Sequence, residues 1–74
     1  MTEIGVETEA AGIVSRIERA EGQHVARDEP IVFVEIMKME IPVPAPAGGK
    51  IVKILVAEGD AVTEGQRIAI LETP

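Results

Sequence analysis

The residues best suited to chemistry in this 74-residue chain are Met37, Lys38, Met39 and Glu40, which follow one another at its middle. The flanking residues 31–36 and 41–43 are rich in β-branched side chains, which favour strands. Two strands this close need a tight turn, and tight turns favour Gly, Asn or Asp because these residues tolerate positive φ angles. The turn region holds two thioethers and an ammonium instead. A local rule broken at an exposed point is typical of function, so we expect Lys38 to be a presented group.

The two methionines support this interpretation of Lys38. Methionine side chains are adaptable and polarizable, and they are over-represented on surfaces that partner proteins read. With only a short turn between the strands, Met37 and Met39 cannot both face the core. The alternative is an ordinary exposed turn lysine, which gives no reason for two neighbouring thioethers. We therefore predict that other proteins recognise this tip.

The remaining reactive side chains form no catalytic pattern. The chain has no cysteine, which excludes disulfides, thiol chemistry and Cys-ligated metal sites. The single histidine, His24, falls near a predicted turn, and Ser15 falls in a predicted strand without a base close in sequence. Glu35 and Glu40 flank Lys38 and are expected to pair with solvent or with that lysine. Carboxylates and one histidine at irregular spacing do not predict a metal site.

Charge and hydropathy exclude several classes of protein. Seven Lys and Arg against thirteen Asp and Glu give a net charge of −6. A surface that binds nucleic acid or anionic membranes needs a basic patch, so we expect neither partner. No apolar run approaches the length that spans a bilayer, and the first residues lack a secretory pattern. These features favour a cytoplasmic protein.

The apolar composition predicts an all-β fold. Ile and Val number ten and nine, Leu only two, and Phe33 is the single aromatic residue. Such a ratio favours sheet over helix, and the short chain suits a small sandwich or barrel. Residues 13–17 would also suit a short helix, but the repeat described next favours a strand with a bulge. The predicted strands cover residues 3–7, 12–19, 24–26, 30–36, 39–44, 49–57, 61–63 and 67–72.

The chain contains an internal repeat with a shift of 37 residues. Nine of 26 aligned positions are identical, and each copy predicts a long strand, a Glu-Gly turn, a short strand and a final strand ending in Glu. Two such copies are expected to pack about a pseudo-two-fold axis. Lys38 then corresponds to residue 1, or to one step past residue 74, so it should lie opposite the chain ends. The identities are Ala10/Ala47, Gly12/Gly49, Ile17/Ile54, Ala20/Ala57, Glu21/Glu58, Gly22/Gly59, Val25/Val62, Ile31/Ile68 and Glu35/Glu72.

Three prolines at alternate positions, Pro42, Pro44 and Pro46, predict an edge strand. Alternate residues of a strand direct their N–H groups toward the same edge, so these prolines leave one edge without donors. Together with Gly48 and Gly49 they would also suit a linker between two domains. Neither half is large enough to form a core alone, so we predict a single domain over residues 1–74.

These residues resemble a known family. Residues 35–40, Glu-Ile-Met-Lys-Met-Glu, stand at the centre of a duplicated β-rich unit and resemble the biotinyl domain, also called the biotin carboxyl carrier domain. The resemblance covers almost the whole chain. It includes Gly-Asp-Ala-Val at residues 59–62, Glu-Gly-Gln at residues 64–66 and Gly-Lys-Ile-Val at residues 49–52.

The resemblance implies a flattened barrel of two four-stranded antiparallel sheets, with biotin attached through an amide to the ε-nitrogen of Lys38. It implies a biotin protein ligase as partner, with Glu35, Met37, Met39 and Glu40 as its recognition residues. The domain, a monomer when isolated, would be a non-catalytic carrier. It would shuttle carboxyl groups between a biotin carboxylase and a carboxyltransferase, as in acyl-CoA, pyruvate or oxaloacetate carboxylases.

Departures from the family pattern and two rivals stay open. Ile36 replaces the usual Ala or Ser, and residues 22–25 and 27–30 lack the Gly-Asp-x-Val and Gly-Gln patterns, which should affect local turn geometry and leave modification intact. A lipoyl domain shares the fold, but its lysine usually follows Asp and precedes Ala. An unmodified structural module of the same fold typically lacks the Met-Lys-Met tip.

Overall fold

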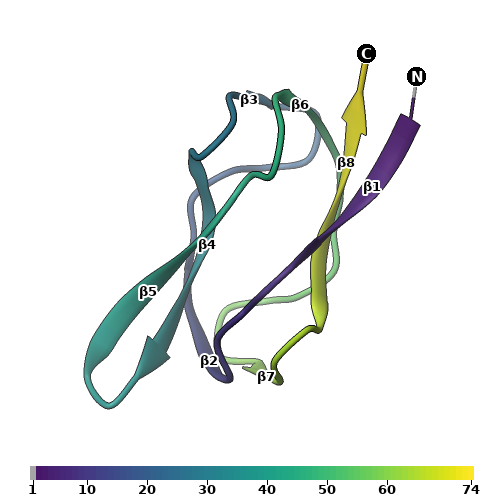
Figure 1. Ribbon diagram of the computed structural model, residues 1–74. Coiled ribbons are helices and arrows are strands. Elements are labelled where there is room, and N and C mark those ends of the chain that lie inside the picture. Colours follow the sequence, from purple (N-terminus) through teal and green to yellow (C-terminus); the bar gives the residue numbers. More distant parts are fainter. Residues whose placement is uncertain (1) are drawn as a thin grey trace.

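The structure, a computed structural model, describes residues 2–74, which form eight β-strands joined by turns and loops (Figure 1). β-Branched residues dominate the strands, as their preference for a pleated, half-buried surface requires. The strands are β1 (Thr2–Glu7), β2 (Gly12–Ile17), β3 (His24–Val25), β4 (Pro30–Ile36), β5 (Met39–Pro44), β6 (Gly49–Ile54), β7 (Ala61–Val62) and β8 (Arg67–Thr73).

The strands of residues 2–74 form two four-stranded sheets in which neighbouring strands run antiparallel. One sheet has the order β1-β8-β6-β3 and the other β5-β4-β2-β7. The described residues make an elongated body of 37 × 17 × 17 Å. The predicted all-β flattened barrel is confirmed, and β5 is an edge strand as the three prolines indicated.

The two halves of the chain are related strand by strand. A shift of 37 residues carries β1, β2, β3 and β4 onto β5, β6, β7 and β8, and it exchanges the two sheets. The repeat therefore extends beyond the identities seen in sequence and includes β1 and β5. Residues 2–37 form the first half and residues 39–74 the second, with Lys38 between them. Residue 1, the predicted equivalent of Lys38, lies outside the described residues.

Figure 1 shows the consequence of this symmetry for Lys38. The turn between β4 and β5 lies at one end of the barrel, and the start of β1 and the end of β8 lie together at the other. This is the arrangement that the repeat predicted.

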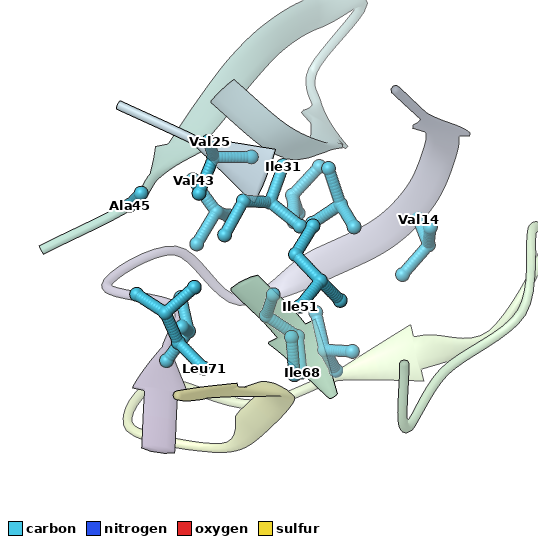
Figure 2. Packing of buried hydrophobic residues seen from close by; sticks show 13 residues of the cluster. Val14, Val25, Ile31, Val43, Ala45, Ile51, Ile68 and Leu71 are labelled. Carbon is cyan, nitrogen blue, oxygen red and sulfur yellow. The ribbon is translucent and has the colours of Figure 1, made fainter. Parts of the chain in front are cut away.

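The core follows the same symmetry. Among residues 2–74, thirteen apolar side chains and Thr8 are buried, and these fourteen residues divide into seven pairs 37 positions apart. Figure 2 shows labelled members of both halves converging on one interior. Because each half contributes two strands to each sheet, the two halves build one shared interior, and neither can bury its apolar face alone. The pairs are Val6/Val43, Thr8/Ala45, Val14/Ile51, Val25/Val62, Ile31/Ile68, Val32/Ala69 and Val34/Leu71.

Two equivalent glycines allow the chain to approach its neighbour closely. A Cβ on Gly12 would collide with the carbonyl oxygen of Glu35, and a Cβ on Gly49 would collide with that of Glu72. Only glycine leaves the backbone room at these two points.

The first glycine turn keeps its geometry although its sequence departs from the family pattern. Gly22 and its equivalent Gly59 have φ angles of 91° and 92°. The Ala20 N–H donates to Gln23 Oε1 at 2.9 Å, just as the Ala57 N–H donates to Asp60 Oδ2 at 2.9 Å. We expected the departure to change the local turn; this is wrong, because the longer Gln23 side chain reaches the same donor.

The second departure is compensated in the same way. Asp28 adopts a φ of 73°, close to the 82° of its equivalent Gly65. Glu29 Oε1 accepts the Ala26 N–H at 2.7 Å, whereas Gln66 Oε1 accepts the Thr63 N–H at 3.0 Å. The backbone hydrogen bond from Ala26 lowers the pKa of Glu29. Desolvation opposes this change, and the nearby Arg19 guanidinium adds to the lowering.

β2 and β6 are strands with a register irregularity, between Val14 and Arg16 and between Ile51 and Lys53 respectively. This confirms the predicted bulge, and the alternative of a short helix is wrong. Both strands end earlier than predicted, at Ile17 and Ile54. Each strand is followed by one more backbone hydrogen bond, from the Glu18 N–H to the Ile31 carbonyl and from the Leu55 N–H to the Ile68 carbonyl. The chain then enters the Gly22 and Gly59 turns, which side chains stabilise.

Candidate functional site

The candidate site is the two-residue turn that joins β4 to β5. Ile36 and Met39 are the last pair in the register of the hairpin, so Met37 and Lys38 alone form the connection. Their φ angles are 51° and 67°. Positive φ at both central residues is the signature of a type I′ turn, whose twist matches that of the flanking strands.

The turn presents its three central side chains to solvent. Met37 is 91% exposed and Met39 60% exposed, and Lys38 is exposed as well. No ion pair within 4 Å involves Lys38 among residues 2–74. The prediction that the two methionines do not both face the core is confirmed, and the Lys38 amine is accessible.

This conformation costs free energy that a different sequence would avoid. A non-glycine residue in the left-handed region costs about 1–2 kcal/mol, and the tip contains two such residues. Asn-Gly would relieve most of that cost. The hairpin below the tip holds the turn in place, because Val34 is fully buried and pairs with Ile41. The side chains at the tip are therefore kept at the expense of turn stability.

The two glutamates beside the tip lie directly opposite each other across the hairpin. Like charges in this position repel. Arg16 offsets the repulsion, because its guanidinium contacts Glu40 at 3.2 Å. The expectation that Glu40 pairs with Lys38 or with solvent is corrected here. Glu35 is exposed and takes part in no ion pair within the described chain.

Arg16 organises this outer face of the sheet. It also contacts Glu18 at 2.9 Å, and its guanidinium carbon lies 4.3 Å from the centre of the Phe33 ring. Exposed contacts of these two kinds each contribute about 1 kcal/mol or less. This cluster was not predicted from the sequence, because the register shift between Val14 and Arg16 determines which residue lies opposite Phe33.

The other candidate residues are separated from the tip. His24 is exposed in β3 and lies opposite Lys50 of β6, in the sheet that does not contain the tip. Ser15 Oγ donates to the Phe33 carbonyl at 3.2 Å. Within residues 2–74, no group of three or more His, Asp or Glu side chains could hold a metal ion. The same residues contain no helix that is both long and apolar enough to cross a membrane.

With this geometry established, the chain can be compared with known proteins. A family model described as "Biotin-requiring enzyme" matches residues 1–71. The chain therefore belongs to this family of biotin and lipoyl attachment domains.

Curated relatives include proteins named for each of the two cofactors. The chain is 35% identical over 66 residues to the "Biotinylated protein TB7.3 homolog" of Mycobacterium leprae, covering 89% of this chain and 93% of that protein. It is 44% identical over 52 residues to a probable dihydrolipoyllysine-residue succinyltransferase component of the 2-oxoglutarate dehydrogenase complex of Schizosaccharomyces pombe. That match covers 70% of this chain but only 12% of the Schizosaccharomyces pombe protein.

Solved structures give the same two groups. The urea carboxylase of Kluyveromyces lactis superposes with a TM-score of 0.90 at 30% identity, over 97% of this chain and 6% of that one. The lipoyl domain of the 2-oxoglutarate dehydrogenase complex of Azotobacter vinelandii superposes with a TM-score of 0.71 at 32% identity, over 92% and 96%. The fold is thus that of the biotinyl and lipoyl domains.

Proposed function

We propose that this protein is a biotin carrier, with biotin attached to Lys38. The observation that carries the proposal is the exposed turn in which Met37 and Met39 flank an accessible amine. The relative named a biotinylated protein, which this chain matches along most of its length, supports the choice of biotin. The carrier would serve a biotin-dependent carboxylase, moving carboxyl groups between a biotin carboxylase and a carboxyltransferase, in the cytoplasm.

The site fits the attachment reaction. The unprotonated Nζ of Lys38 would attack the acyl carbon of biotinyl adenylate, forming an amide while AMP leaves with the bonding electrons and the nitrogen gives up a proton. The reaction needs an amine that is not held in an ion pair, and Lys38 makes no ion pair with any carboxylate of residues 2–74. A biotin protein ligase would supply the adenylate and take the proton.

Specificity must come from the surroundings of Lys38, because Lys50 and Lys53 are exposed too. We infer that the ligase reads the shape of the hairpin through Met37 and Met39, whose flexible thioethers suit a recognition surface. Among the neighbouring carboxylates, Glu35 is the more available contact, because Arg16 holds Glu40.

The barrel determines what the attached group can reach. Biotin attached to Lys38 would supply a ureido ring that can hold the carboxyl group in transfer. The tip lies at the end of the barrel remote from the described chain ends, which keeps that end clear for large enzymes. Tethering raises the effective concentration of the carried group at each partner without any new contact. Partner enzymes, not this chain, would choose the substrate.

A lipoyl carrier is the second candidate. It is favoured by the match to the dihydrolipoyllysine-residue succinyltransferase and by the structural likeness to a lipoyl domain. Against it stands Met37, at the position where lipoyl domains usually have Asp, and Met39, where they usually have Ala.

The experiment offers the unmodified chain to each enzyme separately: a biotin protein ligase with biotin and ATP, and a lipoate ligase with lipoate and ATP. Intact-mass spectrometry then reports the adduct. We expect one biotin per wild-type chain, none on the matched Lys38→Arg variant, and little or no lipoyl adduct. A lipoyl adduct without biotin would establish the second candidate, and a biotin adduct on Lys38→Arg would refute the assignment of Lys38.

A further inference from the structure

The two edge strands β1 and β5 are equivalent by symmetry but have opposite capacities for hydrogen bonding. β5 and the residues after it contain Pro42, Pro44 and Pro46. The residues 37 positions earlier are Gly5, Glu7 and Glu9. Proline has no N–H, so the edge of β5 is blocked at each of these positions, whereas β1 keeps its donors.

The direction of these donors follows from the hydrogen bonds of Thr8. The Thr8 N–H donates to the Gln66 carbonyl at 3.0 Å, and the Thr8 carbonyl accepts the Gly65 N–H at 2.7 Å. Successive residues of a strand direct their backbone groups to opposite sides. The N–H and C=O groups of Glu7 therefore point away from the sheet, toward the free edge of β1. Glu9 lies beyond the strand at a bend, and the fold does not need its N–H, because the equivalent Pro46 has none.

The equivalent place on β5 confirms this geometry. The Ala45 N–H donates to the Glu29 carbonyl at 2.8 Å, and the Ala45 carbonyl accepts the Asp28 N–H at 2.9 Å. Pro44 and Pro46, on either side, therefore turn toward the free edge, where a missing donor costs nothing.

A groove runs beside the free edge of β1. It has a volume of about 730 Å³, and both edges contribute to its lining. Glu7 at the end of β1 and Glu9 two residues further on line it, together with Pro44 and Pro46 from the other edge. A strand entering this groove would find hydrogen-bonding partners on the β1 side and no donors from the prolines on the other.

The groove is acidic. Glu7, Glu9 and Glu64 line it, and Glu3 lies further along β1. One cation approaches from the neighbouring strand: the Arg67 side chain lies over Gly5, so close that a Cβ there would be 2.5 Å from Nε. An adjoining hollow, which Glu7 and Glu9 also line, adds Arg27 and Asp28. Among residues 2–74, five carboxylates against two guanidinium groups leave this edge net negative.

We propose that the free edge of β1 is a docking site for an extended segment of a partner protein that carries basic side chains. The segment would add a strand to the β1-β8-β6-β3 sheet through the backbone groups of Gly5, Glu7 and Glu9, and its cations would lie beside the glutamates. A second copy of this chain is a poor occupant, because β1 against β1 would bring two rows of glutamate together.

The symmetry supplies a variant that separates backbone from side chain. Glu7→Pro introduces at position 7 the residue that already occupies the equivalent position 44. The substitution removes one N–H donor from the free edge, and the fold already accommodates proline at the equivalent place. Glu7→Ala is the matched control, because it removes the same carboxylate and keeps the N–H. Glu9→Pro, which copies Pro46, serves if Glu7→Pro does not fold.

The probe is a capped peptide of alternating valine and lysine, titrated into the ¹⁵N-labelled chain and followed by amide chemical shifts. We expect shifts centred on Gly5, Glu7 and Glu9, with slower hydrogen exchange at these amides. Glu7→Pro should weaken binding about tenfold or more, because it loses a hydrogen bond and leaves a peptide carbonyl unpaired. Glu7→Ala should weaken it no more than about fivefold, as the loss of an exposed ion pair does.

Three results would overturn the proposal. Equal weakening by Glu7→Pro and Glu7→Ala would show that charge alone holds the peptide. An absence of shifts at β1, or shifts centred on β5 or the tip, would remove the site. Shifts at β1 that depend on protein concentration without peptide would identify a second copy as the occupant.

Discussion

The tip turn and the glycine turns of the barrel all require positive φ angles but meet this requirement with different residues. Gly22, Gly59 and Gly65 have φ angles between 82° and 92°, and nothing lies within 4 Å of the Cβ that each lacks. At the tip, Met37 and Lys38 also have positive φ angles, although neither is glycine. The glycine turns are therefore built for backbone geometry alone, whereas the tip retains side chains that its geometry disfavours.

The two halves of the chain are alike where they fold and differ at the surface. Their interiors share seven pairs of buried residues, but their outer faces diverge. Ile13, 45% exposed and beside Glu35, corresponds to Lys50 beside Glu72 in the other half. Phe33, under Arg16, corresponds to Ile70. Symmetry thus defines a baseline: the interior keeps it, and the departures from it lie on the outer surface.

The largest effect should come from breaking the shared interior. Ile31→Ala and Ile68→Ala each remove a fully buried side chain at equivalent positions, and each should lower the free energy of unfolding by about 2–5 kcal/mol. Urea unfolding followed by circular dichroism measures both losses. If one variant is far more stable than the other, the halves do not contribute equally to one core.

A smaller change in stability, this time a gain, should distinguish the tip turn from the glycine turns. Met37→Gly should raise the free energy of unfolding by about 0.5–1 kcal/mol, because relief of the left-handed strain exceeds the added chain entropy. The control Gly59→Ala should lower it by about 1 kcal/mol. Thermal unfolding measures both changes.

The same Met37→Gly variant should take up biotin more slowly, and a ligase assay checks the rate. An unchanged rate would show that Met37 is not read by the ligase. A loss of stability would show that the tip carries no strain.

The smallest effect concerns Glu29 and its equivalent Gln66. The pKa of Glu29 in the folded chain lies below its ordinary value of 4.5, so its carboxylate stabilises the fold above that pH, and the stabilisation disappears as pH falls through the lowered pKa. Glu29→Gln keeps an acceptor for the Ala26 N–H, as Gln66 does for Thr63, but does not titrate. The stability of wild type relative to Glu29→Gln should therefore fall on acidification, as thermal unfolding across the acid range would show. A constant difference would contradict the role of the carboxylate.

Much of the fold could be predicted because two signals agreed. β-Branched runs marked the strands, and the repeat located their equivalents, so the strands begin within a residue of their predicted starts. The end of β6 could not be predicted, because the apolar residue Val56 lies in the following loop and packs against the core there.

The tip could be predicted as an exposed turn, because no other arrangement accommodates Met37 and Met39. The contacts around it could not. The pairing of Arg16 with Glu40 depends on a bulge that shifts the register, and a sequence gives the presence of a bulge more readily than its position. The contrast between the edges of β1 and β5 needed the symmetry of all eight strands, which the sequence repeat covered only in part.

The most direct test of the account is to map where biotin is attached. The chain is biotinylated by a biotin protein ligase, digested, and each lysine-containing peptide is sequenced by mass spectrometry. We predict biotin on the ε-nitrogen of Lys38 alone, with Lys50 and Lys53 unmodified although both are exposed. Biotin on Lys50 or Lys53, or an unmodified Lys38, would contradict the claim that the turn between the two halves is the functional site.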